Sequence, residues 1–264
     1  LKMKMSYLFP KVFIDMIRII RAFLIYLFNI KLLSKNNHLR NSKFCEKVYV
    51  IANGPSLSSF DYNNIKNIDV IVMNNFDLCE WKDKVNIVAH CIGEPKNSEQ
   101  WGNDQIEISK NTNAESYWYH YSVFKQIKNY NKIMDEKSYY FFTPLIPEDM
   151  FLFNDFNLCF PTLGYSTTAQ MAIMVAIFMG YKEISLVGFD HDMLKNRNIS
   201  PHFYKEGTHA RVVDKTNESY LKIMTRCLKM WNRYYKIKRV SIAKNVEIIN
   251  RTSNSYLDVF KISK

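Results

Sequence analysis

The sequence predicts a single α/β domain with a mainly parallel, Rossmann-like sheet, preceded by an amphipathic N-terminal helix. Three observations support this fold. From residue 47 onward, short β-branched runs alternate with helical stretches, which is the pattern of parallel strands joined by helices. The chain has 264 residues and 47% hydrophobic content, which is enough for one substantial globular core. Polar residues follow several expected strands, at the edge where such sheets bind ligands.

The N-terminal segment differs from the rest of the chain. Residues 9–33 are strongly apolar, but charges interrupt them, and the longest uncharged run, residues 22–30, is nine residues long. A membrane-spanning helix needs about 20 apolar residues. The segment therefore predicts an amphipathic helix in a membrane interface, with packing on the protein's own core as the alternative. We expect residues 1–43 to be a membrane-associating helix with a polar linker, and residues 44–264 to be the α/β domain.

The net charge of +11 is concentrated at the two ends of the chain. Residues 1–50 carry a net charge of +8 and residues 215–264 a net charge of +9, which leaves −6 for the residues between them. This distribution does not suit a nucleic-acid-binding stripe along one fold. It suits a protein whose ends touch an anionic membrane surface, although a solvated lysine-rich surface would give the same counts.

Cysteine spacing and the missing hydrolase motifs exclude several classes of site. The five cysteines are scattered and show no CxxC or CxxH spacing, so we expect neither a disulfide framework nor a structural zinc. The same spacing leads us to expect that the protein resides in a reducing compartment. The sequence has no GxSxG and no HExxH, so hydrolase and zinc-protease functions lack support.

The expected strands and helices follow from the apolar runs. Long helices are expected at residues 167–179, a stretch rich in Ala and Met that Gly180 ends, and at residues 217–235. The expected strands are residues 48–52, 69–73, 85–89, 139–142, 183–187 and 239–243.

The first expected strand ends in Asn53, Gly54, Pro55 and Ser56. Gly54 would let the backbone approach a ligand closely, and Ser56 would cap the next helix and offer N–H groups to a phosphate. The segment is not a P-loop, because no GK[ST] follows it. A plain strand-to-helix turn is the alternative explanation of this spacing.

Polar residues also follow two other strands. Asn74 and Asn75 come after the second strand, and Asp190, His191 and Asp192 come after the strand at 183–187. The DxD spacing of the two aspartates is one that nucleotide-sugar enzymes use to hold a divalent cation through diphosphate oxygens. Such a short pattern also arises by chance.

Three of the six histidines, His191, His202 and His209, fall within a stretch of weak periodicity that also contains Tyr204. The stretch is expected to be a loop crossing the site. A histidine there would act as a general base at neutral pH. Surface histidines in a loop are the alternative.

Several of these segments resemble one known family. Residues 50–57 (VIANGPSL) are similar to the opening strand and loop of the bacterial sialyltransferases of glycosyltransferase family 42, and residues 73–76 (MNNF) resemble their second-strand turn. Residues 167–190 resemble their long helix and the strand that follows it. The resemblance covers roughly residues 47–192. A broader group of surface-polysaccharide proteins, with a Rossmann fold related to archaeal pterin diphosphokinases, shares the first loop.

The resemblance implies a GT-A-like single domain that transfers a nonulosonic acid, such as sialic acid, from a CMP donor with inversion and without a metal cofactor. It implies that the first loop holds the donor, that an asparagine of the second turn holds its nucleotide, and that a loop histidine deprotonates the acceptor hydroxyl. The candidate catalytic residues are His202, His209 and Asp190. The candidate donor-binding residues are Asn53, Gly54, Pro55, Ser56, Asn74, Asn75, Thr167, Thr168, His191 and Tyr204.

Two departures from the family pattern favour a different donor. Tyr165 stands where the family has a functional arginine, and Asp192 stands where it has a tyrosine thought to stabilise the departing phosphate. A carboxylate beside a phosphate needs a cation between them. The alternative is therefore a transferase that uses a nucleotide-diphosphate donor, or a diphosphokinase-like phosphotransferase, with Mg²⁺ or Mn²⁺ at Asp190 and Asp192.

The leading functional expectation is a glycosyltransferase of bacterial surface polysaccharide or lipooligosaccharide synthesis. Its expected partners are the CMP-activated donor, a glycan or lipid-linked acceptor and the membrane surface, with no nucleic acid. We expect it in the cytoplasm, peripheral on the inner face of the inner membrane. Association into a homo-oligomer is left open, and a non-catalytic nucleotide-binding subunit is the remaining alternative.

Overall fold

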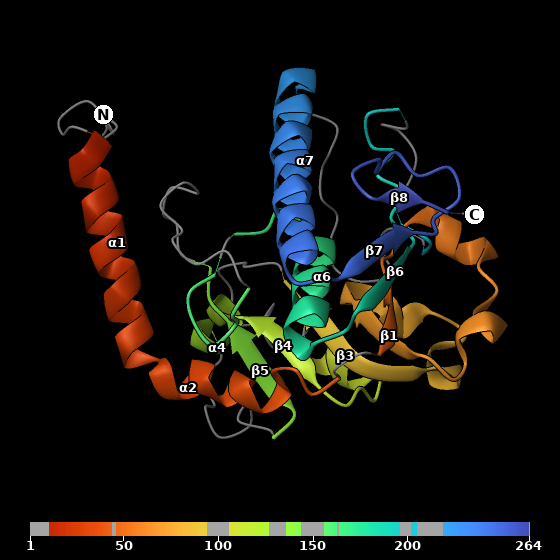
Figure 1. Ribbon diagram of the computed structural model, residues 1–264, viewed down its shortest axis with the longest axis horizontal. Coiled ribbons are helices and arrows are strands. Elements are labelled where there is room, and N and C mark those ends of the chain that lie inside the picture. The colour runs from red at the N-terminus through yellow and green to blue at the C-terminus, as the bar shows by residue number, and fades with distance from the viewer. Residues whose placement is uncertain are drawn as a thin grey trace.

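The computed structural model describes residues 11–43, 46–93, 106–126, 136–143, 156–162, 164–195, 202–204 and 219–263. These residues form one α/β domain around an eight-stranded sheet, with helices against it and an N-terminal helix at its side (Figure 1). All strand pairs in the sheet are parallel. The predicted fold class is thereby confirmed.

The strand order is β5-β4-β3-β2-β1-β6-β7-β8, so the chain builds outward from β1 to β5 and then returns to the other side of β1. This reversal between β1 and β6 is the place where a parallel sheet opens a crevice at the carboxyl ends of its strands. The strands are β1 Lys47–Ile51, β2 Asp69–Met73, β3 Asn86–Ile92, β4 Tyr117–His120, β5 Ser138–Phe141, β6 Glu183–Val187, β7 Glu247–Asn250 and β8 Lys261–Ile262.

The helices connect and cover these strands. They are α1 Lys11–Phe28, α2 Ile30–Ser34, α4 Tyr121–Gln126, α6 Thr168–Met179 and α7 Tyr220–Ala243. Short 3₁₀ turns lie between them: η2 Lys35–Leu39, η3 Pro55–Ser59, η4 Tyr62–Ile65, η5 Asn74–Leu78 and η6 Lys82–Lys84. Two of these turns, η3 and η5, directly follow β1 and β2, so irregular backbone begins where the candidate ligand residues lie.

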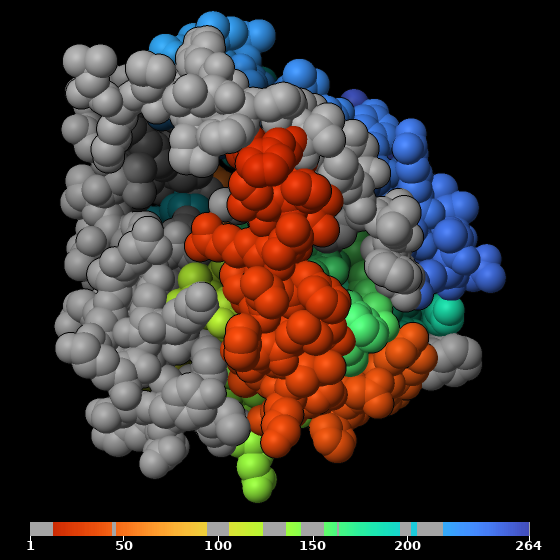
Figure 2. All heavy atoms as spheres, turned by 90° about the vertical axis from the view of Figure 1, so that its left-hand side faces the viewer, coloured from red at the N-terminus to blue at the C-terminus, as the bar shows by residue number. Residues whose placement is uncertain are grey.

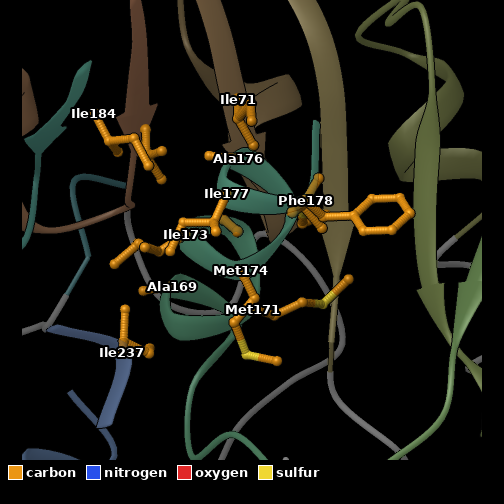
Figure 3. Close-up of a cluster of buried hydrophobic side chains, with 14 of the residues drawn as sticks. Ile71, Ala169, Met171, Ile173, Met174, Ala176, Ile177, Phe178, Ile184 and Ile237 are labelled. Carbon is orange, nitrogen blue, oxygen red and sulfur yellow. The ribbon is translucent and has the colours of Figure 1, made fainter. Parts of the chain in front are cut away.

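Helix α6 lies at the centre of the core. Every residue from Thr168 to Met179 is buried, which fits its apolar composition on all sides. Figure 3 shows its side chains between Ile71 of β2, Ile184 of β6 and Ile237 of α7. The predicted stop at Gly180 is confirmed, because this residue takes a left-handed φ of 99° as the C-cap.

The strand expected at residues 239–243 is wrong. Helix α7 continues through this segment to Ala243, and Val240 and Ser241 keep its buried face against the core. The strand that follows is β7, which begins at Glu247 after Asn245 turns the chain with a φ of 53°. The β-branched residues of this segment predicted a strand, although they also continue the 3.6-residue period of the helix.

The segment expected as a polar linker, residues 34–43, contacts the domain directly. The Asn36 side chain is fully buried and donates from Nδ2 to the carbonyl oxygens of Tyr140, at 2.6 Å, and Leu158, at 2.7 Å. The backbone N–H of Lys43 donates to the Met179 carbonyl at 2.8 Å. These bonds fix the base of the N-terminal helix against the sheet and the end of α6.

Candidate functional site

The loop after β1 is locked against the end of β6. The Gly54 N–H donates to the Gly188 carbonyl at 3.1 Å. A Cβ atom on Gly54 would lie 1.8 Å from Asp190 Oδ2 and 2.4 Å from the Gly188 oxygen, so only glycine fits there. Gly188 itself has a φ of 74°, and a Cβ on it would lie 2.3 Å from the Ala52 oxygen. The close approach expected of Gly54 is therefore to the protein's own strand end.

Asp190 holds this loop in place. Its Oδ1 accepts from the Ser56 N–H at 3.1 Å, and its Oδ2 accepts from the Ser56 hydroxyl at 2.8 Å. Burial raises the pKa of the Asp190 carboxyl above its ordinary value, while the two bonds from Ser56 act in the opposite direction. Pro55, between Gly54 and Ser56, occupies the first position of the η3 turn. The geometry makes Asp190 a positioning residue for the loop.

The hydrogen bonds of Asp190 also bear on the Mg²⁺ or Mn²⁺ alternative. Both of its carboxylate oxygens already accept a hydrogen bond from Ser56, so they are directed at the loop. Within the described part of the chain, no three His, Cys, Asp or Glu side chains converge as a metal-binding group. The Asp190 carboxylate is thus directed at Ser56, and the Mg²⁺ or Mn²⁺ alternative stays a prediction.

Asn53 joins the ends of β1 and β2. Its side chain is only 5% exposed, and its Nδ2 donates to the Met73 carbonyl at 3.2 Å. Its Oδ1 has no hydrogen-bond partner among the described residues. A buried amide oxygen without a partner is costly, so this atom is suited to accept a hydrogen bond from a ligand.

Asn74 begins the turn after β2 and is held by a residue that the sequence did not reveal. It takes a left-handed φ of 48°, and its carbonyl lies 2.7 Å from His90 Nε2. Since a carbonyl only accepts, His90 Nε2 carries the proton, and Nδ1 lies 2.8 Å from the Thr112 hydroxyl oxygen. Burial lowers the pKa of His90 to about 4, so it is neutral. The Asn74 Oδ1 also has no partner in the described structure, and Asn75 is buried beside it.

The start of α6 lies over the end of β3. Thr167 caps the helix, with its hydroxyl 3.4 Å from the Gln170 N–H. A Cβ on Gly93, just after β3, would lie 3.1 Å from the Thr168 hydroxyl. The Tyr165 hydroxyl donates to the Gly93 carbonyl. The side chain that departs from the family pattern therefore fixes the backbone at the end of β3.

A basic residue that the sequence analysis did not single out stands at the same place. Arg233 of α7 donates from Nη1 to the Ser166 hydroxyl at 2.8 Å, one residue before the α6 N-cap. Its guanidinium thus adds positive charge to the N-terminal end of α6, which already favours anions. The sequence of α7 gave no sign of this contact, because the contact depends on how α7 packs over α6.

His191 faces α7 and not the loop after β1. Its Nε2 lies 2.9 Å from the Tyr234 hydroxyl, and its ring packs edge-on against Trp231 and Tyr234. It adopts a left-handed φ of 53°, and burial lowers its pKa to about 4. The structure gives this expected donor-binding residue a place in the α7 interface.

The two expected loop histidines differ in what the structure describes. The Phe203 N–H donates to the Asn53 carbonyl at 2.9 Å, so the segment 202–204 runs beside the first loop. The His202 and Tyr204 rings are stacked, with centroids 5.0 Å apart and planes at 13°. His209 lies outside the described residues. The structure therefore brings His202 and Tyr204 to Asn53.

The solved structures that match this chain include two complexes of the sialyltransferase CstII from Campylobacter jejuni. The complex with the substrate analogue cytidine-5'-monophosphate has a TM-score of 0.48 and 20% identity, over 84% of this chain and 86% of that chain. The complex with CMP-3FNeuAc has a TM-score of 0.45 and 19% identity, over 83% and 85%. Neither a protein-family model nor a curated protein matches the sequence. We therefore base the functional assignment on the residues of the site.

Proposed function

We propose that the protein is a glycosyltransferase that transfers sialic acid or a related nonulosonic acid from a CMP donor to a sugar hydroxyl with inversion. One observation carries this proposal. Among the described residues, Asn53 and Asn74 present amide oxygens without partners at the ends of adjacent strands, beside the point where the strand order reverses. Their loops are the ones that resemble the donor loops of family 42 sialyltransferases.

The chemistry of these two amides suits a nucleoside. A carboxamide oxygen accepts hydrogen bonds, and the exocyclic amino group of cytosine and the ribose hydroxyls donate them. The Asn53 amide is held by its bond to the Met73 carbonyl, and the Asn74 backbone is held by the bond between its carbonyl and His90, so the Asn53 amide and the turn that carries Asn74 are fixed before a ligand arrives. Preorganised groups of this kind lower the ordering cost of binding.

The charged part of the donor would meet the start of α6. A CMP-activated nonulosonic acid carries a phosphate and a carboxylate. The N-terminus of α6, the Thr168 hydroxyl and the Arg233 guanidinium offer hydrogen-bond donors and positive charge at that edge. As the bond between the anomeric carbon and the phosphate oxygen breaks, these groups would stabilise the charge that develops on CMP.

We assign the general base to His202, with His209 as the alternative. His202 stands next to the segment that pairs with Asn53, and the Tyr204 ring stacks on it. The base takes the proton of the acceptor hydroxyl while the acceptor oxygen attacks the anomeric carbon from the face opposite CMP. Replacing the base should lower kcat by roughly 10²- to 10⁴-fold without weakening CMP binding.

The test is a comparison of His202→Ala and His209→Ala in an assay that follows CMP release from CMP-sialic acid with a sugar acceptor. Loss of turnover in either variant, with CMP affinity retained, identifies the base. Full turnover in both variants would contradict the assignment. Absence of any turnover in the unmodified protein, alongside tight CMP binding, would favour a nucleotide-binding subunit.

We further propose that the enzyme acts in bacterial surface polysaccharide or lipooligosaccharide synthesis, as a peripheral protein of the inner face of the inner membrane. The support is α1, which exposes large apolar side chains such as Ile20, Phe23 and Phe28. None of the described helices combines the length and hydropathy that a membrane-spanning segment requires. A glycan acceptor carried by a lipid would be reached from such a position.

A further inference from the structure

Helix α1 has one covered face and one exposed apolar face. Ala22 and Asp15 lie on the covered face, where Asp15 is 3% exposed and its carboxylate pairs with Arg18 at 3.1 Å. The opposite face carries Phe13, Ile17, Ile20, Phe23, Leu24 and Phe28, with exposures from 41% to 85%. Figure 2 shows α1 on the outside of the molecule.

Helix α7 carries a second exposed apolar stripe, at its N-terminal half. Leu221, Met224 and Leu228 follow the three-and-four spacing of one helix side and are 73%, 47% and 63% exposed. Ile223, Cys227 and Met230 form a separate, buried side of the same helix. The stripe is therefore additional to the face that holds α7 on the core.

The length of α7 carries this stripe beyond the sheet. Its 24 residues span about 36 Å, whereas a strand such as β7 spans about 13 Å. Because α7 leads directly into the parallel strand β7, the N-terminal half of α7 extends past the carboxyl edge of the sheet. In Figure 1 the first turns of α1 and α7 both lie beyond the sheet on the same side.

The charge of α7 indicates what covers the stripe. Across its 24 residues the helix has seven Lys or Arg and no Asp or Glu. Lys222, Arg226 and Lys229 lie within the projecting half, between or beside the exposed leucines. A second copy of α7 would bring the same positive charges face to face, which disfavours self-association. An apolar stripe flanked by basic residues fits the interface of an anionic bilayer.

We infer that the projecting half of α7 and the outward face of α1 form a two-point contact with an anionic phospholipid bilayer. The contact turns the carboxyl edge of the sheet, with Asn53 and the loop that contains it, toward the membrane surface. This inference rests on the proposed function in one respect: a lipid-linked acceptor gives that orientation its use. The membrane contact itself does not depend on the identity of the donor.

The experiment is co-sedimentation of the full chain with vesicles of phosphatidylcholine alone and of equimolar phosphatidylcholine and phosphatidylglycerol. The unmodified protein should bind the anionic vesicles, and added salt should weaken the binding. The double variant Leu221→Ser, Leu228→Ser should lower the apparent affinity by at least about 10-fold, because two large apolar side chains no longer enter the interface. The double variant Lys222→Gln, Arg226→Gln should lower binding to the anionic vesicles and leave binding to the phosphatidylcholine vesicles unchanged.

Ile242→Ser is the matched control, because Ile242 is 65% exposed on the same helix but lies at the opposite end. It should leave vesicle binding unchanged. Equal binding by the unmodified protein and the double leucine variant would overturn the inference, as would a loss of the same size in Ile242→Ser. A fall in molecular mass by sedimentation equilibrium in the double variant would overturn it in favour of a contact between copies.

Thermal shift with CMP, measured on the same proteins without vesicles, separates this inference from the proposed function. Loss of vesicle binding with CMP binding retained is the expected phenotype of the double leucine variant. Vesicle binding without any response to CMP in the unmodified protein would contradict the donor assignment and leave the membrane contact standing.

Discussion

The carboxyl edge at β1 and β6 and the projecting halves of α1 and α7 differ in what completes their packing. At the edge, Gly54, Ser56 and Asp190 fit together so closely that one added methyl group would overlap a carboxylate. On the helices, Ile20 and Leu221 remain 50% and 73% exposed. The edge at β1 and β6 is thus fully packed by residues of this chain, whereas the projecting halves of α1 and α7 keep exposed apolar surface.

This difference shows that the residues of the two regions serve different purposes. The residues at the edge fix backbone geometry, and the amide oxygens of Asn53 and Asn74 there are buried without a partner among the described residues. The residues on the helices add little to the fold and remain available to an external surface. Substitutions at the edge should therefore change stability and nucleotide binding, whereas substitutions on the helices should change neither.

Gly54→Ala should have the largest effect. The new Cβ would lie 1.8 Å from Asp190 Oδ2 and 2.4 Å from the Gly188 oxygen, so the loop must move. We expect a loss of about 4 kcal/mol in the free energy of unfolding, measured with urea, and loss of CMP binding. Gly164→Ala is the control: its Cβ would be 3.5 Å from Arg233 Nη2, which is ordinary contact, and should cost about 0.5 kcal/mol or less. Equal costs for the two variants would contradict a locked loop.

The stability of the fold should fall in acid because of buried neutral histidines. Burial lowers the pKa of His90, His120 and His191 to about 4 each, from 6.5. Between these pH values the unfolded chain binds more protons, so the stabilisation is complete above pH 6.5 and is lost as the pH falls toward 4. His191→Phe should reduce the slope of unfolding free energy against pH by up to about 1.4 kcal/mol per unit, or about 3 kcal/mol over the range.

Urea unfolding at a series of pH values measures this slope. Tyr234→Phe, which removes the hydroxyl beside His191 and keeps the histidine, is the matched control and should retain the steep dependence. An unchanged slope in His191→Phe would mean that folding does not lower the pKa of this histidine.

Asp190→Asn and Asp192→Asn should differ, because only Asp190 accepts both bonds from Ser56. In Asp190→Asn one acceptor becomes a donor facing Ser56, which should cost about 2 kcal/mol of stability and weaken CMP binding. Asp192→Asn should bind CMP as the unmodified protein does. If both variants instead lose a response to Mg²⁺ or Mn²⁺ with a nucleoside diphosphate, the two aspartates form a metal site.

The smallest effect should come from α1. Ile20→Ser changes a half-exposed side chain on the open face of the helix, so the free energy of unfolding should shift by no more than about 0.5 kcal/mol. Ala22→Ser, on the covered face, tests the opposite side with the same new hydroxyl and should be the more costly of the two. The reverse ranking in urea unfolding would mean that the apolar face of α1 packs on the protein.

Much of the fold was predictable, because five of the strands are apolar runs bounded by turn residues, as at 69–73 and 183–187. The strands β4, β7 and β8 were missed, because each has four residues or fewer and is too short for a clear pattern, although Tyr and Trp of β4 favour strands. The misplaced strand at 239–243 failed for the opposite reason: it is β-branched, but the packing of α7 keeps it helical. In this second case local propensity loses to tertiary contacts.

The candidate site was predictable where residues follow strands in sequence and not where packing brings them together. Asn53, Ser56 and Asn74 lie at strand ends, so their shared edge follows from the topology alone. The contacts of His90 with Asn74 and of Arg233 with Ser166 join residues distant in sequence, so no local sequence pattern predicts them. The bonds of Asp190 with Ser56 and of His191 with Tyr234 likewise join residues distant in sequence.

Binding of CMP in the absence of metal tests the central claim most directly. The measurement is the thermal stability of the unmodified protein and of Asn53→Ala with CMP, UDP, GDP or ADP, in EDTA and in Mg²⁺ or Mn²⁺. CMP at 100 times its Kd should stabilise the unmodified protein by roughly 2.7 kcal/mol in EDTA, and Asn53→Ala should lose most of this response. Stabilisation only by a nucleoside diphosphate with metal, and equally in Asn53→Ala, would contradict the account.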